Sequence, residues 1–268
     1  MHWTAALPMY NVAPALARDW RALLDDFHTQ LLPWLAARGD TLSIVDTEPD
    51  LTAFWLRDDL LLSQTCGYPL VHALAGRVNL VATPHFDAPG CETGAYRSVL
   101  VVGSHVDAEP LADCRGLRAV YNSDDSNSGM NLLRHAVAPL ARDGQFFASV
   151  QRSGGHLASL RALAIDRSAD IAALDCVTFA FVRDYLPELA AGVREIGVTE
   201  STAALPFITS KNLPADVLFK ALSDALARDE QRARRLRLKG LVARTPADYA
   251  SILDLENEAI ERGYPRLG

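Results

Sequence analysis

Cysteine is scarce in this chain, and its 268 residues contain four cysteines with no C-x-x-C pair. Metal knuckles and thioredoxin-like motifs need closely spaced cysteines, so the sequence gives no support to either. No motif calls for a cofactor or a metal. The cysteines are expected to be free and mostly buried thiols. Cys66 and Cys91 both lie at predicted strand-to-loop junctions, and the sequence leaves open whether they bond.

Long hydrophobic runs are also missing. No segment approaches the ~18 uninterrupted apolar residues of a membrane span. The N-terminal residues show no basic n-region and no apolar stretch of about 7–15 residues, both of which a secretory signal needs. We therefore expect no membrane insertion. The chain as it stands reads as cytoplasmic, or as periplasmic if a signal peptide has been removed.

Positive charge is in deficit, because 33 acidic residues face 26 basic ones and the formal net charge is −7. A nucleic-acid partner requires a concentrated positive field, so this balance argues against one. One local basic run follows two acidic residues on a predicted helix, and we expect this run to form a solvent-exposed helix face. The run consists of Arg232, Arg234, Arg235, Arg237 and Lys239.

What the sequence does contain is an alternation of short apolar runs with segments of helical periodicity. A long amphipathic helix opens at Pro14, and its apolar stripe is Trp20, Leu23, Leu24, Phe27, Leu31, Leu32 and Leu35. Repeated strand–helix units predict parallel sheets with helices on both faces. The predicted strands are Ala5–Tyr10, Leu42–Val45, Leu60–Ser63, Val78–Ala82, Ser98–Val102, Leu117–Tyr121, Phe146–Val150, Asp170–Leu174, Val193–Val198 and Leu205–Thr209. Helices are predicted near Asp50–Leu56, Leu70–Leu74, Gly129–Leu140, His156–Ile165 and Cys176–Tyr185, and from about Pro214 and Pro246.

Two α/β lobes, each with its own sheet, fit this alternation better than one continuous sheet. The first lobe is predicted to comprise residues 1–96 and 194–268, and the second residues 97–193. The chain would cross between the lobes near Tyr96–Ser98 and near Pro187–Val198, and these crossings are the expected hinges.

The strongest candidate for a ligand site is the serine-rich turn Ser126-Asn127-Ser128-Gly129, between a predicted strand and a helix. A helix N-terminus has backbone N–H groups without an intrahelical partner and a partial positive charge. Small hydroxyl residues and a glycine let an anion approach those groups closely. Serine and asparagine are also ordinary N-caps, so such a cluster by itself is more often a helix start than a site.

A second turn, Ser153-Gly154-Gly155-His156, again lies between a strand and a helix and adds an imidazole donor. Ligands of open α/β sheets lie beyond the carboxyl ends of strands, so two such turns support each other. Asp175 ends another predicted strand. It is expected to cap the following helix, with a ligand cation as the alternative partner. Tyr10, Tyr68 and Tyr96 each follow a strand and share this topological position.

These residues resemble the phosphate/phosphite/phosphonate-type solute-binding proteins of ABC transporters. The resemblance covers about Leu7 to Thr209. Its most specific parts are Ser126-x-Ser128-Gly129, Gly155-His156 and Asp170-x-Ala172-Ala173-x-Asp175. The segments Leu61-Leu62-Ser63-Gln64-Thr65-Cys66-Gly67-Tyr68-Pro69 and Pro89-Gly90-Cys91 look like a branch of the family whose members often lack export signals.

The resemblance implies the two-lobed type II periplasmic-binding-protein fold, with an oxyanion held in the interlobe cleft. The implied ligand-binding residues are Tyr10, Tyr68, Tyr96, Ser126, Asn127, Ser128, His156 and Asp175. The family usually has threonine at the middle of the serine turn, where this chain has Asn127. The implied partners are a small anionic ligand and an ABC permease, with no cofactor, metal or catalytic residue.

Two other functions compete with transport. A ligand sensor of the same fold in the cytoplasm would use the same cleft without a permease. A cysteine-dependent enzyme is less favoured: Cys66, His156 and Asp175 are the right residue types for a nucleophile, base and orienter, and Ser126, His156 and Asp175 mimic a hydrolase set. Neither set carries a local catalytic signature such as G-x-S-x-G.

Overall fold

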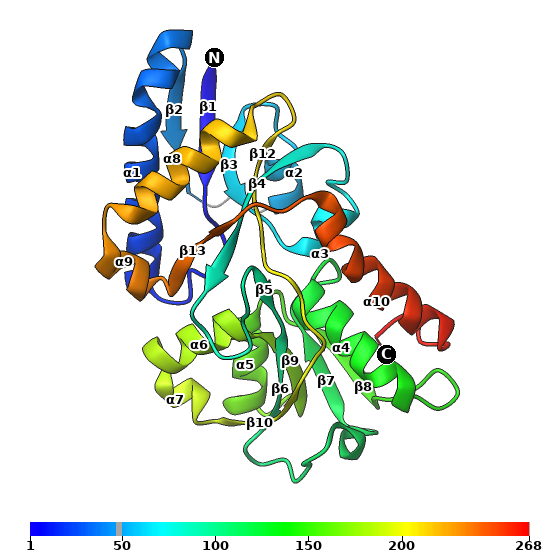
Figure 1. The fold of residues 1–268 in the computed structure, drawn as a ribbon. Helices are drawn as coiled ribbons and strands as arrows, with labels where there is room; N and C mark the ends of the chain where they lie inside the picture. The colour runs from blue at the N-terminus through cyan, green and yellow to red at the C-terminus, as the bar shows by residue number, and fades with distance from the viewer. Residues whose placement is uncertain (47–49, 268) are drawn as a thin grey trace. The chain divides into compact units, whose positions relative to one another are not determined.

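The computed structural model describes residues 1–46 and 50–267 (Figure 1). The chain forms two compact units, each with its own sheet. Unit 1 comprises Met1–Asp87, Glu92–Gly94 and Ala203–Asp248. Unit 2 comprises Ala88–Cys91, Ala95–Thr202 and the chain from Tyr249 onward. No helix within the described residues combines the length and the apolar character needed to cross a membrane.

The units differ from the predicted lobes at residues 88–91 and 95–96, which belong to unit 2 and include Tyr96, and again after residue 193. Residues 194–202 belong to unit 2, because β10 (Val193–Val198) pairs antiparallel with β6 (Ser98–Gly103). The chain from Tyr249 onward also belongs to unit 2, where α10 (Ala250–Glu261) packs on α4 (Leu132–Val137). The C-terminal helix therefore lies with the serine turn and not in the first lobe.

Unit 1 is built on a six-stranded sheet in the order β13-β4-β12-β3-β1-β2. Its strands β1 and β2 are parallel, as are β1 and β3, whereas β12 and β13 pair antiparallel with their neighbours. The strands are β1 (His2–Ala6), β2 (Thr41–Ile44), β3 (Leu60–Gln64), β4 (Val78–Phe86), β12 (Phe207–Ser210) and β13 (Leu238–Val242). Its helices are α1 (Pro14–Arg38), α2 (Leu51–Trp55), α3 (Gly67–Val71), α8 (Ala215–Ala227) and α9 (Glu230–Arg235), followed by the 3-10 turn η4 (Pro246–Tyr249).

The long predicted helix is confirmed as α1, which starts at Pro14 and ends at Gly39 in the left-handed conformation. Six of the seven stripe residues are buried, as a 3.6-residue period requires. Leu32 is the exception: 51% of its surface is exposed, because it lies beside the buried face of the helix.

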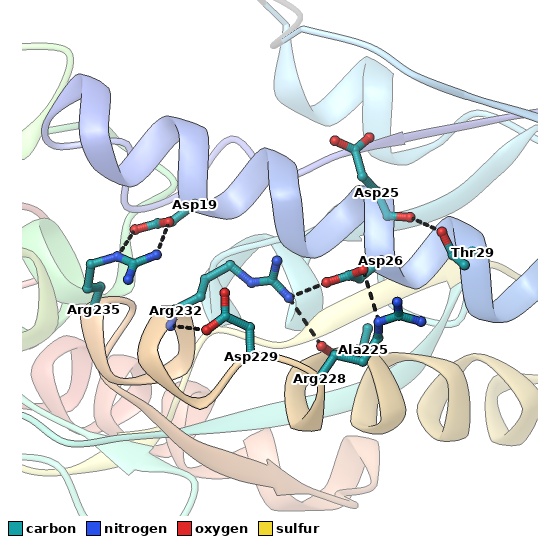
Figure 2. A network of polar contacts seen from close by, with 9 residues as sticks. All are labelled: Asp19, Asp25, Asp26, Thr29, Ala225, Arg228, Asp229, Arg232 and Arg235. Atoms are coloured by element: carbon teal, nitrogen blue, oxygen red, sulfur yellow. Dashed lines mark hydrogen bonds and ion pairs between the residues drawn. The ribbon is translucent and has the colours of Figure 1, made fainter.

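The basic run is a solvated helix face only in part: Arg234 and Arg235 are exposed, whereas Arg232 is buried. Arg232 on α9 is buried and pairs with Asp26 on α1, and Arg235 binds Asp19 with two hydrogen bonds of 2.7 and 2.8 Å (Figure 2). Lys239 lies on strand β13, which the sequence did not predict, and pairs with Asp87. The charges of this run are used largely to attach α9 and β13 to the rest of unit 1.

Unit 2 is built on a five-stranded sheet in the order β10-β6-β9-β7-β8. Strands β9, β7 and β8 are parallel to one another, whereas β6 is antiparallel to both of its neighbours, β9 and β10. The remaining strands are β7 (Arg118–Tyr121), β8 (Ser149–Arg152) and β9 (Ile171–Asp175), and β5 (Ala95–Tyr96) forms a separate two-stranded sheet with β11 (Thr202–Ala203). Its other helical segments are η1 (Leu111–Cys114), η2 (Asn127–Asn131), η3 (Ala138–Leu140), α5 (His156–Ala164), α6 (Cys176–Tyr185) and α7 (Pro187–Ala190).

Most predicted elements are found in place, and the differences have local causes. The first strand ends at Ala6, before Pro8, and Tyr10 takes the left-handed conformation with a φ of 64°. Phe146 and Phe147 precede β8 and are buried in the hydrophobic core of unit 2, so their apolar character reflects core packing and not strand pairing. The mixed α/β class with helix-flanked sheets is confirmed.

Candidate functional site

The sheet of unit 2 brings the predicted site residues of this unit to one edge. The parallel strands β9, β7 and β8 all end at this edge, at Asp175, Tyr121 and Arg152. The antiparallel strand β6 starts there, since Ser98 is opposite Asp175 in the ladder. Ligands of open α/β sheets lie at the carboxyl ends of parallel strands.

The serine turn starts a helix with an unusually wide first turn. Ser126 is the N-cap: its Oγ accepts a hydrogen bond from the backbone N of Gly129 at 3.0 Å. Asn127–Asn131 forms a π-helical turn that continues into α4, and the backbone N of Asn131 reaches the carbonyl of Ser126 at 3.0 Å. Such π turns inside helices are frequent at functional sites.

Gly129 is required by close packing within this turn. A Cβ at this position would collide with the side chain of Asn122 and lie 3.3 Å from Cε1 of His156. The glycine therefore lets the serine turn and the second turn approach each other. The second turn is also tied to the loop after β7, because the backbone N of Gly154 donates to the carbonyl of Asn122 at 2.8 Å.

Ser128 and His156 meet at the centre of the site. The Oγ of Ser128 lies 2.9 Å from Nε2 of His156, and the carbonyl of Ser128 accepts a hydrogen bond from Ser98 Oγ at 2.9 Å. Ser128 is buried, whereas His156 keeps part of its surface accessible at the start of α5. The structure thus confirms that the two turns are adjacent.

His156 is a neutral donor. Burial lowers the pKa of its ring from 6.5 to about 4, because the charged form loses its hydration. Its Nδ1 is buried without a hydrogen-bond partner in the described part of the chain. An orphaned N–H is rarer than an orphaned acceptor, so the proton is best assigned to Nε2. Ser128 Oγ then accepts from His156 and has its own hydrogen to donate elsewhere.

Asn127 points inward and contacts the protein. Its Nδ2 donates to the hydroxyl oxygens of Tyr96 at 3.1 Å and Thr202 at 2.9 Å, and its Oδ1 accepts from Asn131 at 3.0 Å. Thr202 and Asn131 were not among the predicted site residues. The amide of Asn127 is therefore occupied by neighbours within unit 2, and Tyr96 is fully buried beside it.

Asp175 caps α6. One carboxylate oxygen accepts from the backbone N of Val177 at 2.8 Å and of Thr178 at 3.0 Å. This confirms the expected capping role. Since His156 Nδ1 has no partner among the described residues, Asp175 does not orient the histidine as the third member of a catalytic triad would.

Tyr10 and Tyr68 belong to unit 1. Tyr10 follows β1 and packs against Trp20 and Phe86, with ring centroids 6.5 and 5.1 Å away. Tyr68 lies on α3 after β3, is partly exposed, and contacts His72. Cys66 precedes it as the N-cap of α3. These residues follow the parallel strands of their own sheet, as predicted.

The unit 2 cluster is suited to hold an anion. Ser128 has a hydroxyl hydrogen to donate, because its oxygen accepts from the uncharged His156, and it lies beside a helix start whose first backbone N–H groups have no intrahelical partner. No group of three histidine, cysteine or acidic side chains in the described ranges is arranged to hold a metal ion.

The sequence matches the family model of the periplasmic substrate-binding proteins of ABC phosphonate transporters over residues 13–250. The chain belongs to this family. The predicted resemblance is therefore confirmed over almost the whole chain. No curated protein matches significantly.

Solved structures of similar proteins support the type II periplasmic-binding-protein fold. A binding protein component of an ABC phosphonate transporter from Pseudomonas aeruginosa has a TM-score of 0.76 at 16% identity, covering 98% of this chain and 87% of that one. PhnD1 from Prochlorococcus marinus in complex with methylphosphonate has a TM-score of 0.76 at 13% identity, covering 97% and 98%. The alkanesulfonate-binding protein SsuA from Xanthomonas axonopodis pv. citri, bound to MOPS, has a TM-score of 0.62 at 14% identity, covering 99% and 94%.

Proposed function

We propose that this family member binds a small phosphonate-like oxyanion without catalysing a reaction, that the Ser128 hydroxyl is its principal side-chain donor, and that His156 orients this hydroxyl. The observation that carries the proposal is the 2.9 Å contact between Ser128 Oγ and a neutral His156 at the start of the π-helical turn. Neutral donors and a helix N-terminus compensate an anion for lost hydration without a lysine or arginine in the turn. Tyr96 and Ser126, which belong to the same unit, complete the proposed site.

Ligands without an amine should bind better than aminophosphonates. An ammonium group needs an acidic acceptor, and Asp175 already uses one oxygen to cap α6. We therefore propose methylphosphonate, phosphite or phosphate in preference to 2-aminoethylphosphonate. A thermal-shift panel with these ligands and sulfate tests the class, since a ligand at about 100 times its dissociation constant adds about 2.7 kcal/mol of stability. If none of them shifts the melting temperature, the ligand class is wrong.

Replacing Ser128 by alanine tests the site itself. Ser128→Ala removes one buried donor from the proposed anion, which costs roughly 1–3 kcal/mol, or about 5- to 150-fold in affinity. Calorimetric titration with the best ligand of the panel measures the change. Ser123→Ala is the matched control, because Ser123 belongs to the same loop but its hydroxyl bonds Asp125. Equal affinity of the Ser128 variant and the control would remove Ser128 from the site.

The proposed partner is an ABC permease. The alternative role is that of a ligand sensor that uses the same binding site without a permease. Family membership supports the first, because the matching family consists of transporter components. Uptake of the identified ligand by vesicles that contain the cognate permease should depend on added binding protein. Ligand binding without any effect on uptake would favour the sensor, and fractionation of the native protein would show the compartment.

A further inference from the structure

A chain of buried polar side chains connects the serine turn to the C-terminal helix. Asn127, Asn131 and Arg134 follow each other at spacings of four and three residues, so they share one face of the helix. Asn127 and Asn131 are completely buried, and Arg134 is 4% exposed. Burying two amides and a guanidinium is costly unless every one is hydrogen-bonded, so the arrangement demands an explanation.

Each member of this chain is bonded to the next. Arg134 Nη2 donates to Asn131 Oδ1 at 2.7 Å, and Asn131 Nδ2 donates to Asn127 Oδ1 at 3.0 Å. Arg134 is also paired with Glu256 on α10 at 3.1 Å, and its Nη1 donates to the carbonyl of Pro265 at 3.0 Å. Asn131 Nδ2 also donates to the backbone carbonyl of Ile252, which lies on α10, at 3.1 Å. We call these side chains, Asn127, Asn131, Arg134 and Glu256, the relay.

The relay has a fixed direction because a guanidinium can only donate. Asn131 must present its oxygen to Arg134, and its amide nitrogen therefore faces Asn127. Asn127 in turn must accept with Oδ1 and donate with Nδ2 to the hydroxyl oxygens of Tyr96 and Thr202. Those two hydroxyls act as acceptors toward Asn127, so their hydrogens point away from it.

We propose that Asn131, Arg134 and Glu256 are positioning residues for the oxyanion site, and that they make the hydroxyls of Tyr96 and Thr202 donors on the side away from Asn127. The proposal rests on the function proposed above. It assigns Asn127 to the support of the turn instead of to the ligand. It also accounts for an asparagine at a position where a threonine could not accept from Asn131 and donate to two hydroxyls at once.

Reversing the relay without changing its size tests the proposal. In Asn131→Asp the new carboxylate still accepts from Arg134 but cannot donate to Asn127, which must turn its amide nitrogen toward residue 131. The oxygen of Asn127 then faces Tyr96 and Thr202, and their hydrogens turn inward. We expect methylphosphonate affinity to fall by about tenfold, as for loss of one buried donor.

The control is Glu258→Gln. Glu258 bonds His135 at 3.0 Å and so also connects α10 to α4, but this exposed pair has no contact with Asn127. Its affinity should match the wild type. If Asn131→Asp does not fold, Asn127→Asp is the second test. An aspartate at residue 127 cannot donate to the hydroxyls of Tyr96 and Thr202, so their hydrogens should again turn toward residue 127.

Combining each variant with Tyr96→Phe separates the effect of hydrogen-bond direction on ligand affinity from the effect of a general loss of protein stability. In the wild type, loss of the Tyr96 hydroxyl removes a donor and should weaken binding. After Asn131→Asp that hydroxyl is already turned inward, so Tyr96→Phe should have much less effect. Additive losses, or an unchanged affinity in Asn131→Asp with an intact fold, would overturn the relay. If the wild type binds no oxyanion at all, the proposed function fails first and independently.

Discussion

At the scale of single residues, His156 shows how burial changes the chemistry of a side chain. In solution an imidazole titrates near neutral pH, but in this site burial lowers its pKa to about 4. The histidine therefore remains an uncharged donor through the neutral range.

This lowered pKa predicts a pH-dependent contribution to stability. The unfolded chain takes up a proton at His156 below about pH 6.5, whereas the folded chain does so only near pH 4. The contribution is complete above pH 6.5 and is lost as the pH falls from 6.5 to about 4. Urea unfolding in a buffer without oxyanions should show a steeper loss in this window for the wild type than for His156→Gln. Parallel curves for the two proteins would show that His156 is not kept neutral by the fold.

Residue types alone could identify Ser126, Ser128 and His156 as candidates, because turns before helices have recognisable compositions. They could not separate a cap from a site. The proposal of a site depends on the Ser128–His156 contact and on Gly129, whose missing side chain allows the two turns to approach. Asn131 and Arg134 were overlooked, although their spacing from Asn127 places them on one helix face.

At the scale of elements, charge pairs position α9 on α1. Asp26 lies between Arg228 and Arg232 of the two C-terminal helical segments of unit 1, as Figure 2 shows. Arg232 also donates to the carbonyl of Ala225 at 3.3 Å. Composition identified this basic run, but only the packed helices could show that its side chains face acidic partners.

Removing Asp26 should therefore destabilise unit 1. Asp26→Asn leaves the buried guanidinium of Arg232 without a counter-charge, and breaking a buried pair in this way typically costs about 3–5 kcal/mol. Because the Asp26 side chain is 23% exposed, we expect about 2 kcal/mol or more. Asp25→Asn is the matched control: its carboxylate is 60% exposed beside Arg21 and should contribute less than about 0.5 kcal/mol. Urea unfolding measures both, and equal effects would contradict the assignment.

Elements with strong periodicity were predicted well, as α1 and α6 show. Strand β13 was missed because Leu238–Val242 contains Lys239 and Gly240 and follows a basic helix. It forms because β4 offers an unpaired edge, which is a property of the sheet and not of the segment.

At the scale of the whole molecule, two thiols far apart in sequence come together. Cys91 belongs to the short segment Ala88–Cys91 of unit 2, and its Sγ lies 3.5 Å from that of Cys176 at the start of α6. All four cysteines are free thiols. The contact with Cys176, together with burial, raises the pKa of Cys91 well above its usual range.

Oxidation should therefore join Cys91 to Cys176 and not to Cys66. Incubation with glutathione disulfide should remove two protein thiols and release two molecules of glutathione, faster at higher pH because the thiolate attacks. Peptide mapping without reduction identifies the bond, and the melting temperature should rise because a long loop is closed. Cys66→Ser should form the same bond as the wild type, and Cys176→Ser should form no intramolecular disulfide at Cys91. A Cys66–Cys91 peptide would contradict the prediction.

The sequence by itself determined the α/β class, the family, and the two turns of the proposed site, because these depend on local periodicity and on residues that are neighbours in the chain. Tertiary structure decided the rest. It placed the C-terminal helix in unit 2, bonded Ser128 to a neutral His156, and turned Asn127 inward onto a relay that starts at Glu256. Burial and hydrogen-bond direction are properties of packed neighbours, and those neighbours lie as much as 216 residues apart in this chain, as Asp19 and Arg235 do.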